Sequence, residues 1–336
     1  MRKRILPLIL AVAMLVSSAA VLSACNKQEQ LSVVFLGDSI AEAIIGPSPI
    51  SERDRYGYFS LIGLNNGFKY DNRSVSGHQS DDLLEYISRE ETNAMLVQTL
   101  LKKADIIHIS ILGNDLLHNK MSDIIIAAHK DNLDSFERVF TNASQNIAAI
   151  VAKLKEYNPD AHIFFQNVYN PVYEETPLLN AETQTALQGE GIEPSDYRSL
   201  AAVLLNKING ILDKYLESNP GAFHIIDSYT EFEKIYNADK ERGINLIFPD
   251  GIHPSNEGHA VLADITQHKL EELGLVTDKK GAVKRYRQLR IEQLERMFGG
   301  SLDVRKIKRQ LKKADTCEEI TKIYFEAIKG ATPVYY

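Results

Sequence analysis

Short apolar runs alternate with amphipathic stretches along most of the chain. Five runs have the length of strands, at residues 31–38, 68–75, 104–113, 161–170 and 222–229. The first, third and fourth are apolar at nearly every position, as expected for parallel strands covered on both faces. Helical spacing recurs at residues 80–89, 94–103, 135–157, 197–216 and 256–273. This alternation predicts βαβ units and a doubly wound parallel sheet.

Two stretches, residues 41–58 and 169–196, show neither period. Both follow predicted strands, on the side where α/β sheets bind ligands. We expect them to be long loops. Loops of this length are more often functional than not, although ordinary surface loops remain the alternative for most of their residues.

The pattern changes after residue 275. Residues 279–313 contain 13 Lys and Arg against three acidic residues. Apolar positions at helical spacing predict helices over 283–298, 304–314 and 320–328, whose apolar sides pack on the main domain. We expect their basic faces to be solvated. Contact of these faces with anionic membrane or wall polymer is the alternative.

The N-terminus has the layout of a secretory signal, with basic residues at positions 2–4, an apolar run and then small residues. Its ending, Leu22-Ser23-Ala24-Cys25, resembles the lipobox of bacterial lipoproteins, in which cleavage exposes a cysteine that becomes lipidated. An uncleaved anchor is the alternative, because about 20 weakly polar residues can just span a bilayer. The resemblance implies a signal peptide over 1–24, a lipidated Cys25 on a tether over 25–30, and a location on the outer face of the bacterial cell membrane.

Composition narrows the class of protein. The 336 residues are 44% apolar and 25% charged, which is ordinary for a globular protein. The net charge of −7, which becomes −10 without residues 1–24, does not favour a nucleic-acid partner. The two cysteines are Cys25 and Cys317. If Cys25 is lipidated, Cys317 has no partner, so we expect no disulfide framework and interpret it as a semi-buried thiol.

Residues with catalytic chemistry follow the ends of the predicted strands. Gly37-Asp38-Ser39 follows the first strand, and a helical pattern continues from it. Taken alone, this triplet is typical of a helix N-cap. A serine at the carboxyl end of a strand is also well placed to attack a substrate. Its backbone N–H, at the N-terminus of the following helix, can face an oxyanion that the helix dipole favours.

Three further blocks stand at matching positions. Asp250 lies three residues before His253 on one short loop, which suits a general base and the group that orients it. Asn114 ends the third strand and can donate toward an oxyanion, and Gly77 follows the second strand with an accessible N–H. Each block alone has an ordinary turn as its alternative. One parallel sheet, however, would bring all of them to the same edge.

With these blocks the sequence resembles the SGNH hydrolases, also called the GDSL esterase/lipase family, over about residues 31–273. The matching residues are Gly37-Asp38-Ser39-Ile40, Gly77, Gly113-Asn114-Asp115 and Asp250-Gly251-Ile252-His253-Pro254, with isoleucine where leucine is commonest. The resemblance implies a three-layer α/β/α sandwich around a five-stranded parallel sheet of flavodoxin-like order. We therefore expect a hydrolase domain over 31–275 and a basic helical extension over 276–336.

The same resemblance implies the roles of the residues. Ser39 would be the nucleophile, His253 its general base and Asp250 the residue that orients His253. The backbone N–H groups of Ser39 and Gly77, with the Asn114 side chain, would form the oxyanion hole. No metal or organic cofactor is expected.

Other readings of the sequence fit less well. The Gly-x-Ser-x-Gly elbow of α/β-hydrolases is absent around Ser39, and His253 and His259 lack the helical spacing of zinc motifs. We interpret His78 as a solvated loop residue, Asp115 as a brace for its own turn and His259 as packed in the last helix of the domain.

The predicted function is that of an extracytoplasmic serine esterase acting on a lipid, lysophospholipid or acetylated glycan ester. An O-acyltransferase with the same residues and a non-catalytic lipoprotein that binds wall or membrane components are the alternatives.

Overall fold

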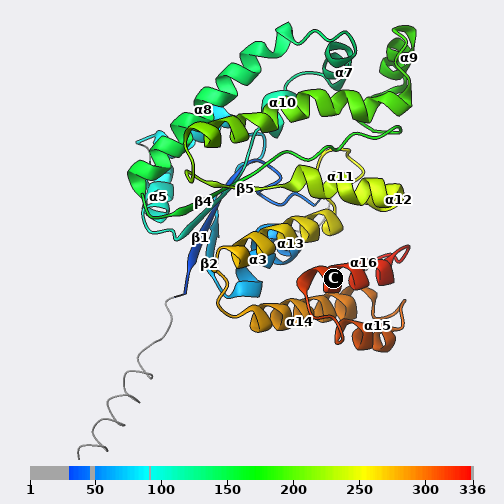
Figure 1. Ribbon diagram of the computed structural model, residues 1–336. Coiled ribbons are helices and arrows are strands. Elements are labelled where there is room, and N and C mark those ends of the chain that lie inside the picture. The colour runs from blue at the N-terminus through cyan, green and yellow to red at the C-terminus, as the bar shows by residue number, and fades with distance from the viewer. Residues whose placement is uncertain (1–29, 46–49, 91, 334–336) are drawn as a thin grey trace, which may run out of the picture. The chain divides into compact units, whose positions relative to one another are not determined.

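The computed structural model describes residues 30–45, 50–90 and 92–333 (Figure 1). All the elements below belong to one compact unit, Ser32–Tyr336. The predicted signal peptide, Cys25 and all but the last residue of the tether lie outside the described residues. Within the described ranges, no helix combines the length and apolarity needed to cross a membrane.

The described part of the chain contains one five-stranded parallel sheet in the order β2-β1-β3-β4-β5. Its strands are β1 (Ser32–Gly37), β2 (Lys69–Asn72), β3 (Ile106–Ser110), β4 (His162–Gln166) and β5 (His224–Ile226). Each lies within a predicted run, and the order is the flavodoxin-like one, so the predicted fold class is confirmed. The predicted runs are longer because buried residues such as Ile111 and Leu112 continue the apolar pattern past the end of the strand.

Helices cover both faces of the sheet (Figure 1). One face carries α4 (Ser80–Ser88), α5 (Thr92–Leu101), α8 (Glu137–Tyr157) and α10 (Tyr197–Ser218), and the other carries α3 (Tyr58–Asn66) and α13 (Asn256–Glu272). Val34 and Leu36 of β1 join the core on the α8 side. Phe35 points the other way and packs edge-on against Tyr58 and Phe59, with ring centroids 5.9 Å apart. This alternation is the period of two expected for a strand buried on both sides.

Both stretches that we expected to be irregular contain helices. Residues 41–58 include α2 (Ile50–Tyr56), and residues 169–196 include α9 (Ala181–Gly189). In α2 only Glu52 and Tyr56 are buried, so the helix shows no apolar stripe. Helix α3 was also not predicted, because it is buried on nearly every side and has no polar face. The other helices are α6 (Gly113–Leu117), α7 (Met121–His129), α11 (Ser228–Ala238) and α12 (Lys240–Asn245).

The C-terminal extension forms α14 (Lys279–Phe298), α15 (Val304–Leu311) and α16 (Cys317–Ile328). Helix α14 packs along α3, and α16 packs against α13 and α14. Arg296 of α14 forms an ion pair with the buried Glu52 of α2, at 2.6 Å. The fully buried Arg290 lies within 5.9 Å of the Tyr56 ring centroid and donates to the Tyr286 hydroxyl. A buried guanidinium needs such partners, so these helices are bound into the packing of the main domain.

Candidate active site

Ser39 lies in a turn over residues 38–43, directly after β1 at the carboxyl edge of the sheet. Our prediction of a helix beginning at Ser39 is wrong. The Asp38 carboxylate accepts the Ile40 N–H at 2.9 Å, and Ala43 has φ +61°, a left-handed conformation that an α-helix does not continue. There is consequently no helix dipole at Ser39, and any oxyanion there must be held by individual hydrogen-bond donors.

The end of β1 requires a glycine because β3 lies so close to it. Gly37 has φ +134°, and a Cβ at this position would lie 1.8 Å from the Ser110 carbonyl oxygen. The same oxygen accepts the Asp38 N–H at 3.1 Å. Burial of the Asp38 side chain raises its pKa to about 7. The turn that carries Ser39 is therefore held directly against the neighbouring strand.

The loop before α13 brings His253 to Ser39. His253 Nε2 lies 2.8 Å from Ser39 Oγ, and His253 Nδ1 lies 2.7 Å from Asp250 Oδ2. The other oxygen, Asp250 Oδ1, accepts the backbone N–H groups of Ile252 and His253 at 2.9 and 3.0 Å. Burial pushes the pKa of Asp250 upward, but these hydrogen bonds outweigh it and leave the pKa below its usual value. An ionised Asp250 keeps the imidazole proton on Nδ1, so Nε2 can accept from the serine hydroxyl.

The loop after β2 lies beside the end of β1, since the Val75 N–H donates to the Gly37 carbonyl at 2.9 Å. Gly77 follows with φ +85°. The Asn114 side chain reaches the same loop and donates one amide hydrogen to the His78 carbonyl at 3.0 Å, which leaves its second hydrogen for another acceptor.

Two backbone donors stand open at this edge. Among the described residues, the N–H groups of Ser39 and Gly77 have no hydrogen-bond acceptor. These two groups and the second Asn114 hydrogen are the donors that the sequence pointed to.

Two residues that support this arrangement were not predicted, and the first is Glu42. Its carboxylate accepts both the backbone N–H of Ser76, at 3.0 Å, and the Ser76 hydroxyl. Arg53 of α2 lies 3.5 Å from the other carboxylate oxygen. Glu42 thus holds the residue immediately before Gly77. The only sequence signal was its place three residues after Ser39, where the helical pattern that continues from Ser39 meets the stretch 41–58 that we expected to be a long loop.

The second is Tyr169, which follows β4. Its hydroxyl donates to the Ile252 carbonyl at 2.6 Å, next to His253, and its ring stacks on Phe232.

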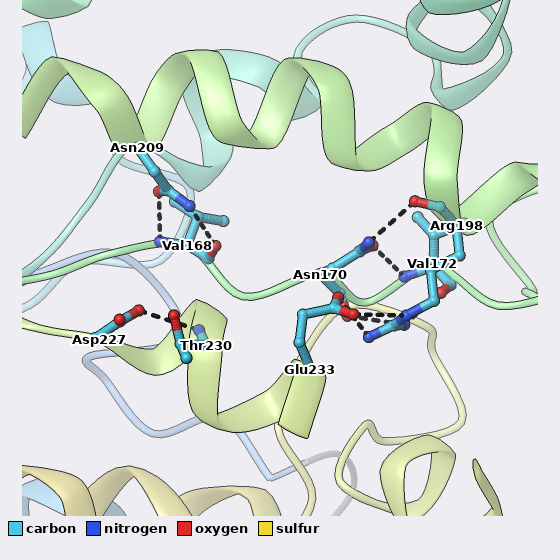
Figure 2. Close-up of polar contacts among 8 residues, drawn as sticks. All are labelled: Val168, Asn170, Val172, Arg198, Asn209, Asp227, Thr230 and Glu233. Atoms are coloured by element: carbon cyan, nitrogen blue, oxygen red, sulfur yellow. Dashed lines mark hydrogen bonds and ion pairs between the residues drawn. The ribbon is translucent and has the colours of Figure 1, made fainter. Parts of the chain in front are cut away.

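The backbone on either side of Tyr169 is fastened by amide side chains, as Figure 2 shows. Asn209 of α10 bonds both the N–H and the carbonyl of Val168 at 2.8 Å. Asn170 donates to the Arg198 carbonyl at 3.1 Å. This segment therefore supports the histidine loop from the side of α10.

The remaining residues named from the sequence lie as follows. Asp115 accepts from the N–H and hydroxyl of Ser80 at 3.1 and 2.6 Å, which ties α6 to α4. His78 is half-buried rather than solvated, and its ring meets the edge of Tyr86. His259 is fully buried in α13, as predicted, and burial lowers its pKa to about 3. Cys317 is buried, and its burial raises the pKa of the thiol far above the ordinary value.

Two surface clefts are lined by other residues. One, of about 430 Å³, lies by the start of α10, and the other, of about 920 Å³, lies between α3 and α14. In the first, Arg198 pairs with Glu233 and Lys240 with Glu174, so its charges satisfy one another. Neither cleft includes Ser39, and we do not assign the substrate to them.

Comparison with known proteins identifies the family. The sequence model of the GDSL-like lipase/acylhydrolase family matches residues 35–261, about two thirds of the chain. The chain belongs to this family. The match includes all five residues proposed from the sequence for the reaction and ends before the C-terminal extension. The chain is therefore a carboxylic ester hydrolase, as the resemblance implied, and that prediction is confirmed.

Solved structures are similar to this GDSL-like protein. A phospholipase A1 from Streptomyces albidoflavus NA297 has 13% identity and a TM-score of 0.50, over 71% of this chain and 99% of its own. The lipase Lip_vut3 from a goat rumen metagenome has 20% identity and a TM-score of 0.49, over 71% of this chain and 97% of its own. An extracellular lipase from Streptomyces rimosus has 14% identity and a TM-score of 0.47, over 71% of this chain and 99% of its own. No curated protein matches the sequence significantly.

Proposed function

We propose that this chain is a membrane-anchored, extracytoplasmic serine esterase that hydrolyses a lipid, lysophospholipid or acetylated glycan ester. The observation that carries the proposal is the continuous chain of contacts from Ser39 Oγ through His253 to Asp250, at 2.8 and 2.7 Å. A hydroxyl, an imidazole and a carboxylate in this order form the arrangement that activates a serine nucleophile. Membership of an ester hydrolase family supports the same conclusion.

The reaction follows from this geometry. Ser39 Oγ attacks the ester carbonyl carbon while its proton passes to His253 Nε2, and Asp250 stabilises the imidazolium through Nδ1–H. The N–H groups of Ser39 and Gly77 and the Asn114 amide donate to the oxyanion that develops. Collapse of the tetrahedral intermediate expels the alcohol, which takes the proton from His253. Water then attacks the acyl-Ser39 ester with His253 again as the base, and release of the acid restores the serine.

The substitution Ser39→Ala tests this chemistry directly. We expect it to abolish hydrolysis of p-nitrophenyl butyrate and labelling by a fluorophosphonate probe, with an unchanged circular dichroism spectrum. Ser135→Ala, at an exposed serine remote in sequence from these residues, is the matched control and should retain both activities. Full esterase activity in Ser39→Ala would refute the assignment.

We also propose that lipid on Cys25 attaches the protein to the outer face of the membrane. The proposal rests on the basic, apolar and small-residue pattern of residues 1–24 and on the lipobox-like ending. Cys25→Ser should lower the share of protein in the membrane fraction and abolish incorporation of labelled fatty acid. Equal fatty-acid incorporation in both proteins would contradict the proposal.

A further inference from the structure

One side of α15 and of the turn after it carries a group of exposed cations. They are Arg305, Lys306, Arg309, Lys312 and Lys313, which we call the α15 basic face. Their spacing of i, i+1, i+4, i+7 and i+8 places them on one side of a helix. The backbone bonds from Lys312 N–H to the Lys308 carbonyl and from Lys313 N–H to the Gln310 carbonyl continue the helical path past Leu311.

The opposite side of α15 fixes how this face is presented. Ile307, Leu311 and Ala314 are buried, and α15 packs against α14 and α16. Arg287 of α14 also donates to the carbonyls of Leu311 and Ala314, at 3.0 and 2.5 Å. The apolar side of α15 is therefore buried within the protein. A partner of α15 would meet charge, with no apolar surface available for insertion into a bilayer.

The cations of the α15 basic face have no carboxylate within ion-pair distance among the described residues. Lys308, from the same helix but outside this face, does pair with Glu295 at 2.5 Å. Among the described residues of the main domain, other cations without a carboxylate partner stand singly, such as Lys120, or as a pair, such as Lys102 and Lys103. A cluster of five is thus a local feature and does not reflect the average surface.

The charge of the chain is also unevenly divided. Residues 276–336 carry a net charge of +7, whereas residues 31–275 carry −17. An anionic surface therefore repels the main domain and attracts the extension, which gives the molecule a preferred orientation near such a surface.

We propose that the α15 basic face docks on an anionic phospholipid bilayer. Clusters of about four to eight Lys and Arg on one helix are sufficient to bind anionic lipid surfaces electrostatically. Neither of the two clefts described above is lined by these residues, so the face fits an extended charged surface better than a single small ligand. The biological setting rests on the membrane attachment proposed above, which would hold the domain within reach of lipid head groups.

Site-resolved lysine acetylation tests this docking on the full chain. The protein is mixed with vesicles of phosphatidylcholine alone or with phosphatidylglycerol, acetylated briefly and analysed by mass spectrometry. We expect the acetylation of Lys306, Lys312 and Lys313 to be several-fold slower on the anionic vesicles. Lys207 and Lys214, exposed on α10, should be acetylated equally on both. The protection should disappear at about 1 M salt, where the Debye length is about 3 Å.

Two variants with equal changes in net charge provide the control. In the first, the five cations of the α15 basic face become glutamine. In the second, glutamine replaces five exposed cations of the main domain: Lys69, Lys120, Arg138, Lys207 and Lys214. Binding of both variants to vesicles is measured by co-sedimentation. Only the variant of the α15 basic face should lose the additional binding that phosphatidylglycerol confers on the wild type. Equal loss in both variants, or equal protection of all lysines in the wild type, would overturn the proposal.

Failure of this proposal can be told apart from failure of the proposed function. Lysine acetylation and vesicle co-sedimentation do not depend on Ser39 chemistry. Both measurements therefore report on docking even if the protein proves to have no esterase activity. Lipid on Cys25 is read separately, from the mass of the N-terminal peptide. Unchanged hydrolysis of a soluble ester by both glutamine variants would show that each is folded.

Discussion

Acid stability provides a quantitative test of the packing behind Ser39. His108 lies in the middle of β3, buried between the rings of Phe35 and Tyr58 at centroid distances of 5.4 and 5.3 Å. Its Nδ1 is 3.5 Å from the Tyr58 hydroxyl, and its Nε2 has no partner among the described residues. Burial lowers the pKa of His108 from 6.5 to about 3, because the site offers the charged form no compensation.

The sign of the effect follows from the proton count. The unfolded chain takes up a proton at His108 near pH 6.5, whereas the folded chain stays neutral until about pH 3. Between these values the unfolded state binds more protons, so the free energy of unfolding falls as the pH falls. At about pH 4.5, two units below the unfolded pKa, the loss from this one residue is on the order of 3 kcal/mol.

The substitution His108→Leu isolates this contribution, since leucine has similar volume and no proton to bind. Urea unfolding at pH 8 and pH 4.5 gives the free energy of unfolding of both proteins. The difference between variant and wild type should move by roughly 3 kcal/mol in favour of the variant on acidification. Other titrating groups contribute equally to both proteins, including Asp38, whose raised pKa acts in the opposite direction. Ile107→Val, at the next position of β3, is the control and should show no such movement.

A difference between His108→Leu and wild type that stays constant from pH 8 to pH 4.5 would refute this reasoning. It would mean that the histidine is already able to take up a proton in the folded protein, through hydration or a local opening of β3.

Three further substitutions address the site and its support. Asp250→Asn should lower kcat for p-nitrophenyl butyrate by about 10³- to 10⁴-fold without abolishing turnover, because the amide favours the wrong imidazole tautomer; an unchanged kcat would contradict this. Glu42→Ala should lower kcat with little change in KM, since it releases the Ser76 N–H, and Glu42→Gln should recover most of the rate by keeping an acceptor oxygen; equal losses in the two variants would argue against positioning. Gly37→Ala should prevent folding, as judged by circular dichroism, because its Cβ would lie 1.8 Å from the Ser110 carbonyl oxygen; a folded, active variant would show that the close approach is not needed.

Much of the fold is readable from the sequence, for a physical reason. Parallel strands that are covered on both faces must be apolar at almost every position, and the helices between them must show one apolar side. Residues 106–110 and 162–166 satisfy the first condition, and 137–157 the second. Helix α3 does not show one apolar side, because the sheet on one side and helices on the other bury nearly all of its residues.

Part of the candidate active site could likewise be predicted from the sequence, and part could not. Polar residues just past strand ends could be picked out from the sequence, because the topology of a parallel sheet brings those ends to one edge. The turn at Ser39 could not, since a helical pattern continues from Ser39 in the sequence, whereas in the structure the Asp38 carboxylate accepts the Ile40 N–H and Ala43 has φ +61°.

Only the tertiary structure decided which residues support the site. Glu42 bonds Ser76, and Tyr169 bonds the backbone next to His253, across 34 and 83 residues of chain. Such contacts leave no period or spacing in the sequence, because they depend on where packing brings distant segments together. The local pattern of apolar and polar residues predicts whether a residue is buried and which face of its helix or strand it occupies. The partner that it meets there is set by the packing of the whole domain.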